Sequence, residues 1–115
     1  MIAIDLSPTL VIGAGLVGAS VGCALTRAGV AVHVTDKVSS HARVAASRGA
    51  GTIRRPDPES VRLVVVAVPP AALAQVIVKA LNTYPKATVT DVGSVKPPWT
   101  RRLSIVRPSW VVVAT

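Results

Sequence analysis

Three glycines at fixed spacing, Gly13, Gly15 and Gly18, most constrain what this chain can fold into. They follow the β-branched run 9–12, which predicts a buried strand, and they open a stretch of small and apolar residues, 16–28, which predicts a helix. In this context G-x-G-x-x-G predicts a strand–turn–helix unit that binds a dinucleotide. The first glycine permits a tight turn, the second lets the backbone approach a pyrophosphate, and the third lets helix and strand pack closely. The alternative is that the glycines serve helix–strand packing only.

The rest of the chain continues the alternation of strand and helix. Further strands are predicted at 30–35, 63–68 and 87–90, a short edge strand within 52–60, and helices at 39–48 and 71–81. Strands alternating with helical runs favour right-handed βαβ units. We therefore expect an α/β fold, a doubly wound parallel sheet of Rossmann-like type in a single domain.

The length of 115 residues allows one domain. We expect residues 1–96 to form the nucleotide-binding domain. Residues 97–115 form an atypical basic tail with both Trp, three Pro and no acidic residue, in which 110–114 can add one more strand.

Asp36 is the residue expected to choose between cofactors. It lies 18 positions after Gly18, at the end of the second predicted strand. A carboxylate there accepts the ribose 2′-hydroxyl and repels a 2′-phosphate, which favours NAD over NADP, although Lys37 beside it has the opposite charge. The alternative is that Asp36 only caps a turn.

Other candidates lie at the carboxyl ends of predicted strands, where ligands collect in parallel sheets. Leu16 and Val17 within the glycine motif, and Val68, Pro69 and Pro70 after the strand 63–68, are expected to line the cofactor site. For the last three, the alternative is a plain helix start with proline in its first turn.

The substrate side is expected in the segment 91–96, Asp-Val-Gly-Ser-Val-Lys, after the strand 87–90. It combines a carboxylate, the Ser94 hydroxyl and the Lys96 amine beside a glycine. The alternative is a solvated turn.

Composition narrows the remaining classes. The formal charge of +8 favours anionic partners, but with no Phe and one Tyr the chain lacks the aromatic platforms that stack single-stranded nucleic acid, and we expect no nucleic-acid partner. Cys23 is the only cysteine, which excludes an internal disulfide and a cysteine metal cage and fits a reducing cytoplasm. The uncharged run 6–26 imitates a membrane helix, but Pro8 and its glycines divide it, so no membrane segment is expected.

The remaining polar residues are assigned no chemistry. We expect His33 and His41 to be structural or solvent-exposed and distant from strand carboxyl ends, and Cys23 to be a small packing residue. Arg54 and Arg55 are expected to be solvated loop charge, and the alternative is that they steer anions. No metal-spaced cluster is present in the sequence.

Taken together, these motifs resemble the amino-terminal nucleotide-binding half of prephenate dehydrogenases, over about Leu10 to Lys96. The resemblance rests on the run Gly13 to Gly22, the strand end at Asp36, the segment 65–70 and above all the segment 91–96. It implies NAD(P)-dependent oxidative decarboxylation of prephenate to 4-hydroxyphenylpyruvate in tyrosine biosynthesis. It also implies that Ser94 helps to orient the substrate hydroxyl and a catalytic histidine, and that Lys96 shapes the same pocket.

The sequence departs from the family pattern after Lys96. The family continues to a Gly-Ser-His-Pro segment and a helical domain that carries substrate arginines and a dimer interface, whereas here no histidine follows Lys96. We therefore expect a truncated chain that is inactive alone and that associates through the apolar segment 110–113. The alternatives are a free-standing NAD-binding regulatory or interaction module, or a fragment of another dehydrogenase of the arogenate or 3-hydroxyacid type.

Overall fold

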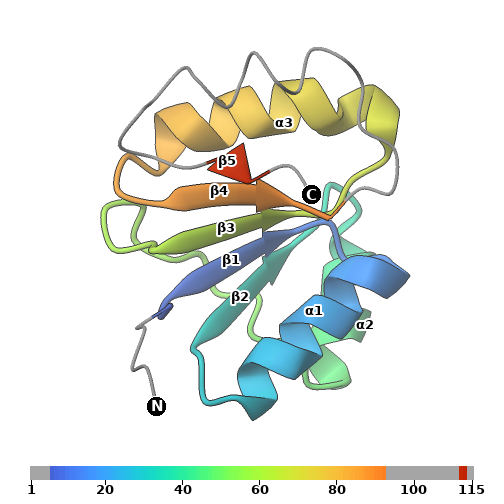
Figure 1. The fold of residues 1–115 in the computed structure, drawn as a ribbon. Helices are drawn as coiled ribbons and strands as arrows, with labels where there is room; N and C mark the ends of the chain where they lie inside the picture. The colour runs from blue at the N-terminus through green and yellow to red at the C-terminus, as the bar shows by residue number, and fades with distance from the viewer. Residues whose placement is uncertain (1–5, 93–111, 114–115) are drawn as a thin grey trace.

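The computed structural model describes residues 6–92 and 112–113, which form a parallel sheet with helices on both faces (Figure 1). The strand order is β2-β1-β3-β4-β5. The strands are β1 (Thr9–Ile12), β2 (Val32–Thr35), β3 (Leu63–Val66), β4 (Thr88–Asp91) and β5 (Val112–Val113), and the helices are α1 (Leu16–Arg27), α2 (Ser39–Ser47) and α3 (Pro70–Thr83). The predicted α/β, Rossmann-like class is confirmed.

The helices begin and end where local chemistry dictates. Pro70 occupies the start of α3, where its missing N–H costs no hydrogen bond. Gly29, at φ +89°, follows α1, and its N–H donates to the Thr26 carbonyl at 3.1 Å. A glycine takes this left-handed conformation without steric cost, so α1 can stop and the chain can turn into β2.

Each face of the sheet has its own apolar core. Toward α3, side chains of β1, β3 and β4 such as Leu10, Val64 and Val89 pack with Leu73 and Ile77 of the helix, and all are buried. On the other face, valines of β1, β2 and β3 pack with alanines of α2 and side chains of α1, Cys23 among them. Both faces are covered, as the near-continuous apolar strands predict.

The reversal of strand order lies between β1 and β3. From β1 the chain leaves toward the face with α1, and from β3 toward the face with α3 (Figure 1). Ile12 pairs with Thr35 on one side and with Val66 on the other, so the three strands end level with one another. The loops that follow them therefore meet at one edge, where parallel sheets bind ligands.

The predicted edge strand within 52–60 is wrong. Only an isolated bridge joins Thr52 to His33 of β2. Pro56 and Pro58 cannot donate to a strand ladder, so the crossover segment between α2 and β3 (residues 48–62) runs as a loop. Ala50 at its start packs in the core on the α1 and α2 face, whereas Ile53 to Pro56 border a cavity together with α3.

Two other expectations concern the ends of the chain. The strand β5, paired in parallel with β4, falls inside the segment 110–114 where a further strand was anticipated. Within the described residues, no helix is long and apolar enough to cross a membrane.

Candidate functional site

The glycine motif after β1 is packed so closely that two of its glycines, one in the turn and one in α1, have no room for a side chain. Gly13 adopts φ +105°, and a Cβ there would overlap the carbonyl oxygen of Ala67. A Cβ on Gly18 would overlap the carbonyl oxygen of Gly13. The predicted roles of these two positions, tight turn and close packing, match this geometry.

Gly15 is different, because open space surrounds the place where its Cβ would be. It caps α1 without a side-chain hydrogen bond, and the first turn of the helix has no acidic residue. The first N–H groups of a helix lack intrahelical acceptors, and the helix dipole makes this end positive. Because α1 has neither a side-chain acceptor for these N–H groups nor an acidic residue in its first turn, its amino end can accept an anion.

Leu16 and Val17 extend this open end. Their relative exposures are 86% and 52%, high values for large apolar side chains. They lie beside the helix end that suits an anion.

Asp36 ties the end of β2 to the glycine turn. Its Oδ2 accepts the Ala14 N–H at 2.8 Å, and its Oδ1 accepts the Val38 N–H at 2.9 Å. Burial works to raise the pKa of this carboxyl, but the two backbone N–H groups and the nearby His41 and Lys37 outweigh it and lower the pKa below 3.8. Asp36 is therefore held as a carboxylate, pointed toward the turn.

His41 corrects one expectation. It was placed away from strand carboxyl ends, but its Nδ1 lies 3.6 Å from Oδ1 of Asp36, which directly follows β2. The sequence spacing contained the signal, because a residue in the first turn of the helix after β2 returns to the strand end. Its imidazole is 59% exposed, as expected. His33 is structural as predicted: its Nδ1 lies 2.6 Å from the Arg54 carbonyl oxygen.

The segment after β3 lies next to the glycine turn. The Ala67 N–H donates to the Ile12 carbonyl at 2.8 Å, and Val68 packs against the core near Gly13. Pro69 and Pro70 are exposed and start α3. The structure thus agrees with the alternative that the prolines start a helix, and it also places Val68 next to the predicted cofactor site.

On the predicted substrate side, the structure describes only the first residues. Asp91 is 1% exposed at the end of β4, level with Val66 of β3. Ser94 and Lys96 lie outside the described residues, as do Trp110 and Val111 of the expected association segment.

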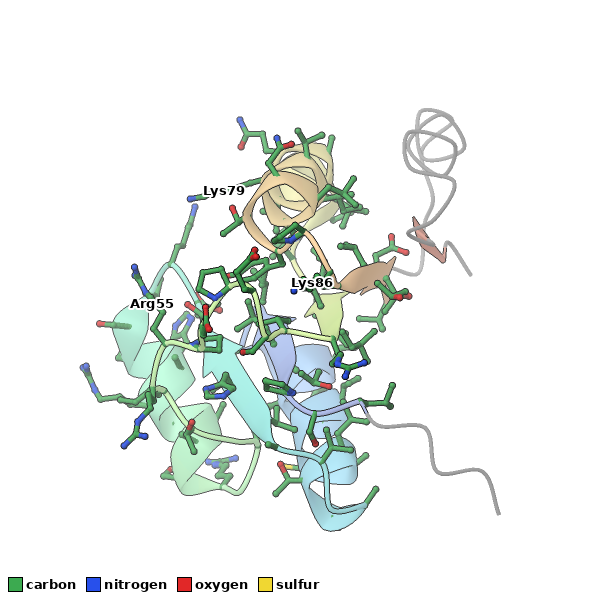
Figure 2. All side chains as sticks on the ribbon, turned by 90° about the vertical axis from the view of Figure 1, so that its left-hand side faces the viewer. Arg55, Lys79 and Lys86 are labelled. Carbon is green, nitrogen blue, oxygen red and sulfur yellow. The ribbon has the colours of Figure 1, made fainter. Side chains whose placement is uncertain are left out.

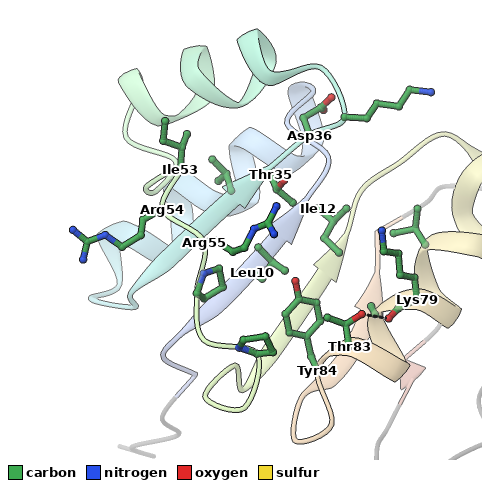
Figure 3. Close-up of a pocket in the computed structure, with 16 residues that line it drawn as sticks. Leu10, Ile12, Thr35, Asp36, Ile53, Arg54, Arg55, Lys79, Thr83 and Tyr84 are labelled. Atoms are coloured by element: carbon green, nitrogen blue, oxygen red, sulfur yellow. Dashed lines mark hydrogen bonds between the residues drawn. The ribbon is translucent and has the colours of Figure 1, made fainter.

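A cavity of about 470 Å³ opens beside Asp36 on the α3 face of the sheet (Figure 3). We call it the crossover cavity, because the crossover segment forms one wall and α3 the other. Sequence reasoning missed it, since it treated Arg55 as solvated loop charge. Its lining residues are Leu10, Ile12, Val34, Thr35, Asp36, Lys37, Ile53, Arg54, Arg55, Pro56, Pro58, Val76, Lys79, Ala80, Thr83 and Tyr84.

These features fit a dinucleotide. Gly15 leaves a cradle that a Cβ would fill, the amino end of α1 suits a pyrophosphate, and Asp36 at the adjacent strand end suits a ribose hydroxyl. No cluster of three His, Cys, Asp or Glu that could hold a metal occurs in the described part of the chain. Fold and turn together define a nucleotide-binding domain of the Rossmann type.

Comparison with known proteins gives the family. The model of the prephenate dehydrogenase nucleotide-binding domain matches residues 21–115. The chain therefore belongs to the prephenate dehydrogenase family, as its nucleotide-binding domain, and the cofactor of this domain is a nicotinamide dinucleotide. The match begins after Gly18, so the glycine turn is supported by geometry instead. The match includes residues 97–115, the segment that was expected to depart from the family pattern. The division of the chain into a domain 1–96 and a tail 97–115 remains a prediction.

One curated relative and two solved structures illustrate the likeness. The probable prephenate dehydrogenase NovF of Streptomyces niveus is 39% identical over 94 residues, which cover 82% of this chain and 26% of NovF. The chain thus spans about a quarter of that relative's length. The fold is similar to Synechocystis arogenate dehydrogenase (TM-score 0.76, 23% identity, 90% of this chain, 39% of that one). It is also similar to Mycobacterium tuberculosis 3-hydroxyisobutyrate dehydrogenase (TM-score 0.68, 19% identity, 92% of this chain, 38% of that one).

The hydrogen bonds of Asp36 predict a pH dependence of stability. A carboxyl whose pKa is lowered by folding stabilises the fold above its unfolded pKa, here 3.8, and this contribution is lost as the pH falls through the lower folded value. In the Asp36→Asn variant an amide N–H₂ faces one of the two backbone N–H donors, which costs about 1–2 kcal/mol at neutral pH. The variant also lacks this acid-dependent loss.

Urea unfolding from about pH 6 to about pH 3 measures both effects. Glu59→Gln, which neutralises an exposed carboxylate far from the turn, is the matched control and keeps the wild-type profile. A wild-type profile in Asp36→Asn would contradict the assigned hydrogen bonds.

Proposed function

We propose that this chain binds NAD in preference to NADP at the junction of β1, α1 and β2. The proposal rests on one observation: the amino end of α1, which has no side-chain cap hydrogen bond, lies next to the Asp36 carboxylate, 2.8 Å from the Ala14 N–H of the glycine turn. In this arrangement the N–H groups of the first turn of α1 bind the pyrophosphate. The unused lone pairs of Asp36 accept a ribose hydroxyl.

The preference for NAD follows from charge. A 2′-phosphate next to Asp36 would place its negative charge beside a carboxylate that two N–H groups already hold ionised. Lys37, next to Asp36, and His41 of α2, whose Nδ1 lies 3.6 Å from Oδ1 of Asp36, reduce this repulsion. The preference is therefore expected to be moderate.

We further propose that the domain supplies the cofactor half of an oxidative decarboxylation of prephenate to 4-hydroxyphenylpyruvate. The membership of the prephenate dehydrogenase family and the likeness to NovF support this assignment. A nicotinamide dinucleotide held by the amino end of α1 and Asp36 would supply the hydride acceptor for this reaction. Asp91, buried at the end of β4, leads into the segment expected to contact the substrate, where Ser94 orients the hydroxyl and Lys96 shapes the pocket.

A proton must also leave the substrate hydroxyl, and no histidine follows Lys96 in this sequence. A general base must lie within hydrogen-bond reach of the proton it accepts. We propose that residues 1–115 bind the cofactor without turnover, and that the base is supplied from outside these residues. Assays with prephenate and with arogenate, followed by cofactor reduction, test this: turnover by the chain alone would overturn it.

The Gly15→Ala variant tests the binding site. The added Cβ meets no protein atom within 4 Å, so the fold is retained, but it occupies the face of the turn that the pyrophosphate approaches. We expect NAD affinity to fall about tenfold or more, which corresponds to about 1.4 kcal/mol, with thermal stability changed little. Calorimetric titration measures the affinity, and Thr26→Ala on the exposed side of α1 is the control. Undiminished NAD binding by Gly15→Ala would place the cofactor elsewhere.

The Asp36→Asn variant tests the cofactor preference. Any disturbance of the glycine turn weakens both cofactors, so the ratio of their dissociation constants isolates the contact at the 2′ position. We expect the wild type to favour NAD and the ratio to shift toward NADP by about tenfold, because the carboxylate charge is gone. An equal loss for NAD and NADP would mean that Asp36 only supports the turn.

A further inference from the structure

The crossover cavity extends away from the proposed NAD site. Thr35 and Asp36 line its end at the carboxyl edge of the sheet, whereas Leu10 and Tyr84 line the opposite end. Tyr84 directly follows α3 and precedes β4, so this end lies toward the amino ends of the strands. The amino end of α1, by contrast, lies on the other face of the sheet (Figure 1). Most of the cavity is thus separate from the pyrophosphate position.

Positive charge dominates the lining. Its lining residues include four cationic ones, Lys37, Arg54, Arg55 and Lys79, and one carboxylate, Asp36, although the side chain of Arg54 points away from the cavity. Figure 2 shows Arg55 and Lys79 on the two segments that form its walls. Within residues 6–92, neither side chain makes an ion pair with an acidic group. These charges are therefore available to an external anion.

The directions of the side chains single out Arg55. In Figure 3 its guanidinium points into the cavity toward β1 and β2, and the Tyr84 hydroxyl faces the same space from below. Arg54, next in sequence, points away from it. Burial raises the pKa of the Tyr84 phenol and the charge of Arg55 partly offsets this, so the phenol stays a hydrogen-bond donor near the guanidinium.

The floor is apolar. Leu10 and Ile12 of β1 and Val76 of α3 line the cavity between the polar groups. The volume of about 470 Å³ lies in the range of about 300–1,000 Å³ that small-molecule sites occupy. A few converging polar groups above an apolar surface are typical of such sites.

We propose that the crossover cavity is a second ligand site, which binds a small organic anion with an apolar body. Its carboxylate or phosphate monoester group pairs with Arg55 and accepts a hydrogen bond from Tyr84, with Lys79 at the α3 wall. The apolar body lies on Leu10, Ile12 and Val76. A guanidinium fork matches both kinds of anion.

Titration of the full chain with benzoate and with phenyl phosphate, followed by calorimetry, tests the site. Benzamide, neutral and of similar shape to benzoate, is the ligand control. We expect saturable binding of at least one anion, about tenfold or more tighter than benzamide, and the stronger of the two anions identifies the head group.

Matched variants assign the binding to the cavity. Arg55→Gln is expected to weaken the anion about tenfold and Tyr84→Phe a few-fold, whereas Arg62→Gln, an equal loss of charge at an exposed residue outside the cavity, leaves it within about twofold. Melting followed by circular dichroism verifies that each variant is folded. No saturable anion binding, or equal weakening by Arg62→Gln, would overturn the proposal, because the net charge would then account for the effect.

Titrations in the presence of NAD distinguish this site from the proposed NAD site. The anion is expected to bind the NAD-saturated chain, and Arg55→Gln is expected to keep NAD affinity. Exclusion of the anion by NAD, together with weaker NAD binding by Arg55→Gln, would assign the cavity to the adenosine end of the cofactor and overturn a separate site. Failure of NAD to bind the wild type would overturn the proposed function while leaving the anion titrations interpretable.

Discussion

Gly13, Gly18 and Ala67 meet where β1, α1 and β3 come together, and no side chain fits between them. This contact lets α1 begin immediately after β1 and fixes the direction of the helix relative to the strand. The rest of the site depends on it. The amino end of α1 is brought to the carboxyl edge of the sheet, and Ala14 is brought within 2.8 Å of the Asp36 carboxylate at the end of the neighbouring strand. The amino end of α1 and the Asp36 carboxylate, which come from separate segments, thereby lie at the same edge of the sheet.

Asp36 combines a structural and a recognition role in one side chain. Its two oxygens accept backbone N–H groups from the glycine turn and from the start of the next helix, so its position is fixed before any ligand arrives. Fixing a recognition group in advance reduces the entropic cost of binding. The interpretations of Asp36 as a turn residue and as a nucleotide contact are therefore compatible.

Local patterns were sufficient to predict the sheet and the turn, because a glycine motif between a strand and a helix permits few arrangements. The position of Asp36 followed from its place at a strand end. Prediction failed in the crossover segment and at His41. The prolines of the crossover segment prevented an edge strand, and that loop directed Arg55 into a cavity although its neighbour Arg54 points to solvent. His41 lies near Asp36 because it is in the first turn of the helix after β2, which returns to the strand end, and this signal in the spacing was overlooked.

The central claim is that a nicotinamide dinucleotide binds at the junction of the glycine turn, α1 and β2. Amide ¹⁵N–¹H NMR of the full chain, titrated with NAD, tests it most directly, because the amides of Ala14, Leu16 and Val17 report on the turn and the first turn of the helix. The account predicts saturable shifts at these amides and at those following Asp36, with small shifts at α2's carboxyl end around Ser47. Shifts confined to other surfaces, or none at millimolar NAD, would contradict it.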